Sequence, residues 1–142
     1  EGISGDLDMS FERETTRLEK LLDFSNGRSS PERFEGARYP VYGSNGIIGY
    51  SDQINATENT IVIGRVGSYC GSLYISPEKC WVTDNAIRAT AKGQNDPYYL
   101  FYLLGTLNLN DKRTGSGQPL LNQSILNSIE VKALQPEEQK AC

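Results

Sequence analysis

The stretch TIVIGRVGSY, residues 60–69, decides the class of fold that this sequence can adopt. It places Ile61, Val62 and Ile63 side by side, and β-branched residues are enriched in strands because they pack well on a pleated surface. Gly64 and Gly67 follow, and glycine within a strand pattern indicates a bulge or the close approach of another backbone segment. We therefore predict a strand here, modified at its glycines.

The residues around this strand extend the β-rich character over residues 36–90. Upstream, YPVYGSNGIIGY (39–50) has short apolar pairs broken by glycines, which predicts short strands and turns. Downstream, GSLYISPEKCWVTDNAIRAT (71–90) predicts two or three more strands, separated by a turn at residues 76–79. The centre of the chain is therefore expected to be mostly sheet.

Two further strands are predicted outside this region. In TTRLEKLLDFSNG (15–27), apolar and polar residues alternate enough to predict a strand. This strand is expected to end in a turn at Ser25, Asn26 and Gly27, where asparagine and glycine tolerate positive φ. IEVKAL (129–134) has the pattern of a final strand.

The sequence then changes to a helical pattern. Asp96 and Pro97 are a favourable N-cap and first helical residue, and YYLFYLLGTLNL (98–109) has the apolar density of a buried helix whose face closes the sheet. The apolar spacing within residues 121–129 predicts a short helix with Asn122 near its cap. The fold class is therefore α/β of the α+β type, a β-rich twisted sheet or partial barrel with a few helices.

A chain of 142 residues has the size of one domain. Residues 1–13 lack apolar periodicity and are interpreted as a leader or linker, and residues 14–134 as the domain itself. PEEQK (136–140) resembles the first turn of another helix, so residues 135–142 are interpreted as the truncated start of that helix. We therefore expect the sequence to be a piece of a larger protein.

Composition excludes several classes of function. No run of about 18 apolar residues spans a membrane, and the acidic start is unlike a signal peptide, so a cytoplasmic protein is expected. Cys70, Cys80 and Cys142 have no metal-ligand spacing, histidine is absent, and reduced thiols are the simpler interpretation. Without histidine, and with no evident pair of carboxylates, the sequence predicts neither catalytic residues nor a metal or cofactor.

The net charge of −4 opposes a nucleic-acid partner, because binding to phosphates depends on lysine and arginine. The acidity is localised, however: residues 1–23 hold seven acidic and three basic residues, whereas residues 24–134 hold nine and ten. The basic residues of this nearly neutral body gather in loops rich in glycine and serine. That distribution suits a module that makes a few directed contacts while other subunits supply most of the electrostatic attraction.

Two glycine-rich motifs could contact a ligand. In YGSNGIIGY (42–50), Ser44 and Asn45 offer donors and acceptors for base edges or phosphates, although Asn-Gly is also the strongest hairpin signal, and both interpretations are compatible. In GRVGSY (64–69), Arg65 can bind guanine, clamp a phosphate or lie on the surface paired with an acidic residue. The flanking glycines favour a contact with DNA.

Two more motifs have simpler explanations beside the functional one. KRTGSGQPLLN (112–122) resembles a flexible basic loop that binds phosphate, but it lacks the order of a nucleotide-binding loop, and an ordinary solvated loop stays open. Asn95, Asp96, Pro97 and Tyr98 resemble the signature with which adenine methyltransferases hold a flipped base. Helix capping explains Asp96 and Pro97 fully, so the catalytic interpretation is not favoured.

Several phrases, in their order and spacing, resemble the target recognition domain of type I restriction-modification specificity subunits. They are YPVYGSNGIIGY (39–50), IVIGRVGSYCGSLYISPEKCWVTDNA (61–86), YYLFYLLGTLNLN (98–110) and GSGQPLLNQSILNSIEV (115–131). The tail LQPEEQK (134–140) is similar to the point where such domains pass into a long spacer helix. The resemblance covers nearly the whole chain.

The resemblance implies a non-catalytic domain of bacteria or archaea that reads one half of a bipartite site in double-stranded DNA. Its expected partners are adenine methyltransferase (modification) subunits and a restriction subunit. The residues expected to contact DNA are Arg28, Ser29, Arg33, Arg38, Tyr42, Ser44, Asn45, Arg65, Ser68, Tyr69, Lys112, Arg113, Ser116, Gln118 and Asn122. Two alternatives stay open: the recognition domain of a single-chain restriction-methylation enzyme, and a β-rich carbohydrate or protein interaction module.

Overall fold

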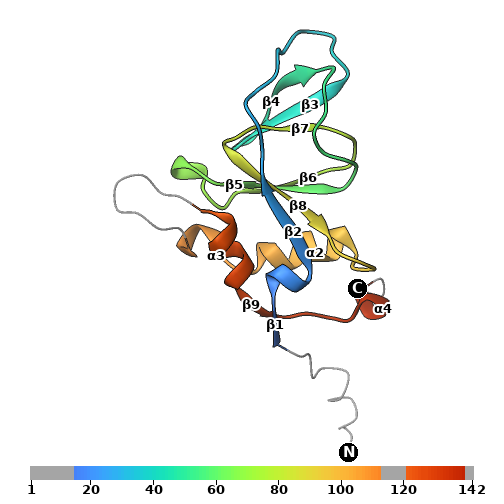
Figure 1. Ribbon diagram of the computed structural model, residues 1–142, viewed down its shortest axis with the longest axis vertical. Coiled ribbons are helices and arrows are strands. Elements are labelled where there is room, and N and C mark those ends of the chain that lie inside the picture. Colours follow the sequence, from blue (N-terminus) through green and yellow to red (C-terminus); the bar gives the residue numbers. More distant parts are fainter. Residues whose placement is uncertain (1–14, 113–120, 140–142) are drawn as a thin grey trace, which may run out of the picture.

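The computed structural model describes residues 15–112 and 121–139, which form an elongated molecule built from layers (Figure 1). A three-stranded sheet lies at one end, a four-stranded sheet in the middle, and helices beyond it; a two-stranded ribbon lies at the other end. The strands are β1 (Thr15–Arg17), β2 (Leu22–Asn26), β3 (Tyr39–Gly43), β4 (Gly46–Ser51), β5 (Thr60–Gly64), β6 (Leu73–Ser76), β7 (Trp81–Val82), β8 (Ala86–Ala91) and β9 (Glu130–Lys132). The α-helices are α2 (Pro97–Gly105), α3 (Gln123–Ser128) and α4 (Pro136–Gln139), and the 3-10 turns are η1 (Leu18–Lys20), η2 (Gly67–Tyr69) and η3 (Leu109–Lys112).

The four-stranded sheet has the order β2-β8-β5-β6, and all its pairings are antiparallel. Strand β5 is buried along its whole length, which explains its continuous apolar run. Ile61 and Ile63 belong to the core cluster that includes the helices, whereas Val62 belongs to the cluster on the opposite face. Burying each of these side chains stabilises the fold by about 1.5–3 kcal/mol.

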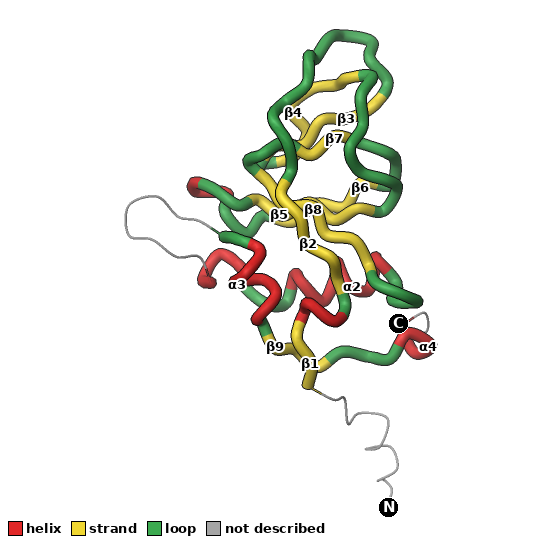
Figure 2. Tube along the Cα trace, viewed as in Figure 1, coloured by secondary structure: helices red, strands yellow, loops and turns green. Residues whose placement is uncertain are grey.

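The three-stranded sheet has the order β4-β3-β7 and covers the second face of the larger sheet. Strands β3 and β4 form an antiparallel hairpin, and β3 pairs with β7 in parallel (Figure 2). Tyr42 and Val82 from this sheet pack with Val62 and Ala86 of the larger one. A second, smaller core therefore joins the two sheets.

Helix α2 covers the first face of the larger sheet, as its apolar sequence predicted. Leu100 and Leu104 are fully buried in the main core. The predicted cap is confirmed, because the Asp96 carboxylate accepts a hydrogen bond from the backbone N–H of Tyr98 at 3.0 Å and Pro97 is the first helical residue. The start of a helix therefore accounts for Asp96 and Pro97 without a base-binding signature.

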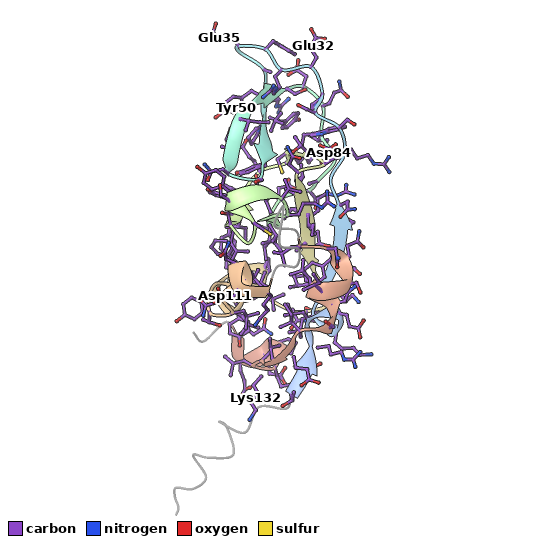
Figure 3. All side chains as sticks on the ribbon, turned by 90° about the vertical axis from the view of Figure 1, so that its left-hand side faces the viewer. Glu32, Glu35, Tyr50, Asp84, Asp111 and Lys132 are labelled. Atoms are coloured by element: carbon purple, nitrogen blue, oxygen red, sulfur yellow. The ribbon has the colours of Figure 1, made fainter. Side chains whose placement is uncertain are left out.

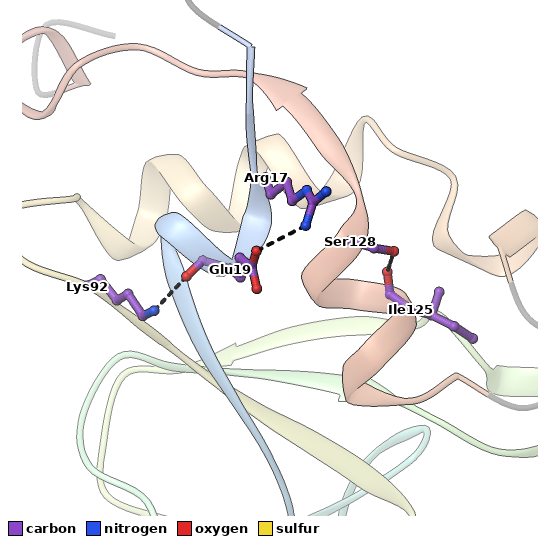
Figure 4. Close-up of polar contacts among 5 residues, drawn as sticks. All are labelled: Arg17, Glu19, Lys92, Ile125 and Ser128. Atoms are coloured by element: carbon purple, nitrogen blue, oxygen red, sulfur yellow. Dashed lines mark hydrogen bonds and ion pairs between the residues drawn. The ribbon is translucent and has the colours of Figure 1, made fainter.

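The ribbon of β1 and β9 and the end of β8 are tied together through η1 (Figure 4). The Lys92 ammonium donates to the backbone oxygen of Glu19 at 2.5 Å, and the Glu19 carboxylate lies 3.4 Å from the Arg17 guanidinium. In α3, the Ser128 hydroxyl donates to the carbonyl of Ile125 within the last turn. These polar contacts fix the helical end of the molecule.

The structure corrects the interpretation of residues 15–27 as one strand. The 3-10 turn η1 separates β1 from β2, and the two strands pair with different partners. The turn with positive φ that was predicted at Ser25, Asn26 and Gly27 is wrong, because the backbone at these residues continues the line of β2. The Gly27 N–H instead donates to the Ala86 carbonyl at 3.0 Å.

The final strand, the short helix α3 and the strands between residues 71 and 91 agree with the sequence analysis. Among the described residues, no helix is long and apolar enough to cross a membrane. In the same part of the chain, no group of three or more cysteine, aspartate and glutamate side chains is arranged to hold a metal ion.

Candidate nucleic-acid interface

One edge of the four-stranded sheet gathers loops that are far apart in the sequence. Strands β2 and β5 both run antiparallel to β8, so their carboxyl ends lie on the two sides of its amino end. Asn26 pairs with Ile87, and Gly64 pairs with Ala86. The residues that follow these strands, which include Arg28 and Arg65, therefore flank the start of β8.

A turn of residues 83–85 connects β7 to β8 between these two arginines. On one side, the Arg28 N–H donates to the Val82 carbonyl at 3.0 Å. On the other side, the Arg65 N–H donates to the Asn85 carbonyl at 3.1 Å, and the Arg65 Nη1 donates to the Asp84 carbonyl at 2.9 Å. Backbone contacts from both neighbours thus hold the turn in place.

Two glycines make this convergence possible. A Cβ atom on Gly27 would lie 1.9 Å from the carbonyl oxygen of Thr83. A Cβ atom on Gly64 would lie 2.4 Å from the carbonyl oxygen of Tyr69 and 2.7 Å from that of Ser44. Contacts this short are not tolerated between real atoms. The close backbone approach predicted for Gly64 is confirmed.

The tip of the β3–β4 hairpin meets the same edge. The Ser44 hydroxyl donates to the Val66 carbonyl at 3.3 Å, which joins the hairpin to the segment after β5. Asn45 is exposed, and its side-chain oxygen accepts a hydrogen bond from the Tyr74 hydroxyl at 3.0 Å. The hairpin interpretation of this motif is confirmed, and its two loop residues lie beside the Arg65 segment.

The segment that begins at Arg65 also forms hydrogen bonds with the residues that precede and follow residues 113–120. The Leu121 N–H donates to the Arg65 carbonyl at 2.9 Å, and the Asn110 side-chain amide donates to the Cys70 carbonyl at 2.8 Å. Ser68 and Tyr69 of η2 are exposed in this region. In Figure 3, which views the molecule from the side of η2, Asp84 lies above η2 and Asp111 below it. Lys112 is exposed next to Asp111; Arg113, Ser116 and Gln118 lie outside the described residues.

Arg28 and Ser29 are exposed on the other flank of the turn. The Trp81 indole N–H donates to the Arg28 carbonyl at 3.3 Å, which fixes the backbone from which the Arg28 side chain extends. Within residues 15–112 and 121–139, the Arg28 guanidinium has no ion pair. It is therefore available as a cation on this edge.

Two arginines from the predicted set lie elsewhere. The Arg33 Nη1 donates to the Ile48 carbonyl at 3.0 Å, and the Arg38 guanidinium lies 5.4 Å from the centre of the Tyr39 ring. Arg38 precedes the start of β3, whereas Ser44 follows its end. A five-residue strand separates them, which corresponds to about 16 Å along its axis.

Tyr42 was expected to contact DNA, but its side chain lies in the core. It is 6% exposed, and its ring packs against Tyr74 with 6.4 Å between ring centres. Burial raises the pKa of the Tyr42 phenol, and a hydrogen bond with Ser76 opposes this shift. A ring in this position cannot stack on a base without leaving the core.

Asn122 is partly buried at the N-cap of α3. Its side-chain oxygen accepts a hydrogen bond from the Ile125 N–H at 2.8 Å, as the predicted cap requires. A side chain that caps a helix in this way has used one of the two lone pairs of its oxygen. Its two amide hydrogens are the only donors left for a ligand.

The turn of residues 83–85 was not among the candidate sites predicted from the sequence. Asp84 and Asn85 are both exposed, and they occupy the middle of the edge. The only available signal was the polar triplet between two strand patterns, which indicates a turn but not its neighbours. Hydrogen bonds to residues far away in the sequence make this turn central.

The sequence model of one family, described as "Type I restriction modification DNA specificity domain", matches residues 12–141. The chain belongs to this family. The resemblance inferred from the sequence is therefore confirmed. A curated relative of this specificity domain is the type I restriction enzyme EcoprrI specificity subunit of Escherichia coli, which is 28% identical over 93 residues. That match covers 66% of the chain and 23% of the relative.

Solved structures share the fold of this specificity domain. The type I restriction-modification S subunit of M. genitalium superposes with a TM-score of 0.78 at 18% identity, over 92% of this chain and 37% of that one. The HsdS subunit of Thermoanaerobacter tengcongensis gives a TM-score of 0.68 at 17% identity, over 90% and 34%. The specificity domain thus spans about a third of these chains, and the sheet-rich fold class with few helices is confirmed.

Proposed function

We propose that this specificity domain reads one half of a bipartite sequence in double-stranded DNA and has no catalytic chemistry of its own. One observation carries the proposal: the ends of β2, β3 and β5 bring Arg28, Ser44 and Arg65 to a single edge around the turn of residues 83–85. Loops held on a rigid sheet are suited to this role, because rigid donors and acceptors lose little entropy on binding.

The residues proposed to contact DNA are those of this edge. Arg28 and Lys112 supply positive charge for phosphates, and Ser29, Ser44, Asn45, Ser68 and Tyr69 supply hydrogen-bonding groups and an aromatic ring. Arg113, Ser116 and Gln118 are retained as proposed contacts from the sequence. Arg33 and Arg38 lie at the far end of the hairpin. A DNA duplex bound at this edge would have to extend along the hairpin to reach them.

The proposed partners are the modification subunits, which methylate adenine, and the restriction subunit of a type I complex in the cytoplasm of a bacterium or archaeon. The proposed recognition domain comprises residues 14–134, preceded by a leader or linker and followed by the start of a spacer helix at residues 135–142. The family membership supports this assignment. It gives no support to the single-chain enzyme or the carbohydrate or protein interaction module.

The experiment that tests the proposal grafts this domain into a complete type I specificity subunit and maps methylated adenines across a genome. One half of the methylated motif is expected to change with the graft. An unchanged motif in a correctly assembled complex would contradict DNA reading. The lone domain is expected to bind DNA weakly at physiological salt, and nanomolar specific affinity would overturn that part.

A further inference from the structure

The turn of residues 83–85 is held in one conformation by its surroundings. The Thr83 N–H donates to the Tyr42 carbonyl at 3.0 Å, and the Ala86 N–H donates to the Thr83 carbonyl at 3.1 Å. The Arg65 side chain adds its hydrogen bond to the Asp84 carbonyl. A turn fixed in this way presents its side chains with little entropy left to lose on binding.

The guanidinium of Arg65 is directed back onto the turn rather than away from the sheet. Its Nη1 is bound to the Asp84 carbonyl, and its Nε is buried without a hydrogen-bond partner among the described residues. Arg65 therefore acts mainly as a positioning residue. The turn that lies between Arg28 and Arg65 in space has two exposed side chains, those of Asp84 and Asn85.

The Asp84 carboxylate is exposed and, in the described part of the chain, has neither a hydrogen bond nor an ion pair. A carboxylate at the centre of a DNA-binding edge repels the phosphates around it. That repulsion lowers affinity for every sequence unless the carboxylate accepts a hydrogen bond from the bound DNA. A base whose exposed groups are only donors satisfies it.

The edges of the four bases in the major groove differ in this respect. A carboxylate can only accept hydrogen bonds. Guanine presents two acceptors, thymine presents an acceptor, and adenine presents an acceptor beside its amino group. Cytosine alone presents a donor, its N4 amino group, without an adjacent acceptor.

We propose that the Asp84 carboxylate accepts a hydrogen bond from the N4 amino group of a cytosine in the major groove and so specifies one base pair of the half-site. This inference rests on the proposed function, because it names the base that the same edge reads. The repulsion between Asp84 and the acceptor groups of other bases adds to the specificity that the attraction to cytosine provides.

The test uses the full-length specificity subunit that carries this domain, assembled with its modification subunits, and compares the wild type with Asp84→Asn and Asp84→Ala. Methylated motifs are mapped genome-wide, and methylation rates are measured on duplexes that differ at one position. Asp84→Ala is expected to reduce discrimination for cytosine at one position by on the order of 10- to 100-fold. Asp84→Asn is expected to shift preference there toward adenine, which asparagine can bind through N6 and N7.

A matched control removes a negative charge elsewhere. Glu78 is exposed in the turn after β6, next to Ser76, which pairs with Thr60 at the opposite end of β5. Glu78→Gln is expected to leave the motif unchanged. A motif change in Glu78→Gln equal to that in Asp84→Asn would overturn the proposal, because it would indicate a general effect of charge.

Two failures can be told apart by including a graft of the whole domain. If the graft changes the half-site but both Asp84 variants keep the wild-type motif, the inference about Asp84 is wrong and the proposed function stands. A change at a position that is not a C·G pair also overturns the cytosine assignment. If the graft leaves the motif unchanged, the proposed function itself fails.

Discussion

The side-chain oxygen of Gln139, in the last described helix, accepts a hydrogen bond from the backbone N–H of Asp96, the N-cap of α2, at 2.5 Å. Gln139 is 1% exposed, and its amide also donates to the Asn95 side-chain oxygen at 2.7 Å and to the Leu134 carbonyl at 2.9 Å. One buried amide therefore connects α4 to the start of α2. Helix α4 is therefore fastened to the start of α2 through a polar side chain.

Replacing Gln139 by leucine is expected to lower the free energy of unfolding by about 1–3 kcal/mol, because it leaves partly buried backbone and side-chain groups without this partner. Urea denaturation followed by circular dichroism measures the change. The exposed neighbour Glu137 provides the control, and Glu137→Gln should change stability by less than about 0.5 kcal/mol. Equal stability of the Gln139→Leu variant and the wild type would show that this contact is dispensable.

Gly27→Ala is expected to destabilise the domain, because its Cβ atom would overlap the Thr83 carbonyl and force β2 away from the turn of residues 83–85. Overpacking of this kind costs about 1–3 kcal/mol or more. Gly105→Ala is the matched control, since a Cβ built there, in the last residue of α2, would meet no atom of the described residues within 4 Å apart from its chain neighbours and the backbone of its own helix. Thermal melting should show a loss for the first variant and a gain of about 0.4–1 kcal/mol for the second.

Arg28→Gln is expected to weaken DNA binding to all sequences alike, because a phosphate contact carries no sequence information. In fluorescence anisotropy titrations over a range of salt, the slope of log K against log salt should become shallower by about 0.9 for one lost phosphate contact. Arg17 pairs with Glu19 at the opposite end of the molecule, so Arg17→Gln should retain the wild-type slope. An unchanged slope for Arg28→Gln would remove this residue from the interface.

Alkaline pH is expected to destabilise the domain through the buried Cys80 and Tyr42. Burial raises the pKa of the Cys80 thiol and of the Tyr42 phenol above 9.0 and 10.0. In the unfolded chain these groups ionise earlier, so the stability they contribute is complete below those values and is lost as pH rises through the raised pKa values. Unfolding free energies measured from pH 7 to 11 should therefore fall above about pH 9.

Tyr42→Phe isolates one of these contributions. The variant is expected to lose less stability between pH 9 and 11 than the wild type, because it has no phenol to ionise at this position. Parallel slopes for Tyr42→Phe and the wild type would contradict the assignment.

Local patterns in the sequence were sufficient for much of the fold. The β-branched run of β5 and the Asp96 cap depend on neighbouring residues, and both were predicted. Residues 15–27 were predicted less well, because η1 interrupts the strand and the two halves pair with segments far away in the chain. Strand pairing of this kind leaves no local signal.

The candidate site was predicted in part for the same reason. Arg28, Ser44 and Arg65 meet at one edge, but the turn of residues 83–85 gains its position from hydrogen bonds between distant strands. Tyr42 was misjudged because it stands beside a glycine-rich loop in the sequence, whereas residues 40–43 of β3 are all buried and strand alternation gives no guide to them.

Main-chain atoms make most of the hydrogen bonds that hold the turn of residues 83–85, and every amino acid carries these groups, except that proline lacks the N–H. The free energy of folding consequently depends little on which side chains stand at positions 84 and 85. Under the proposed function, exchange of these two residues changes the target preference without a compensating change in the interior. The proposed recognition residues and the residues of the interior can therefore vary separately.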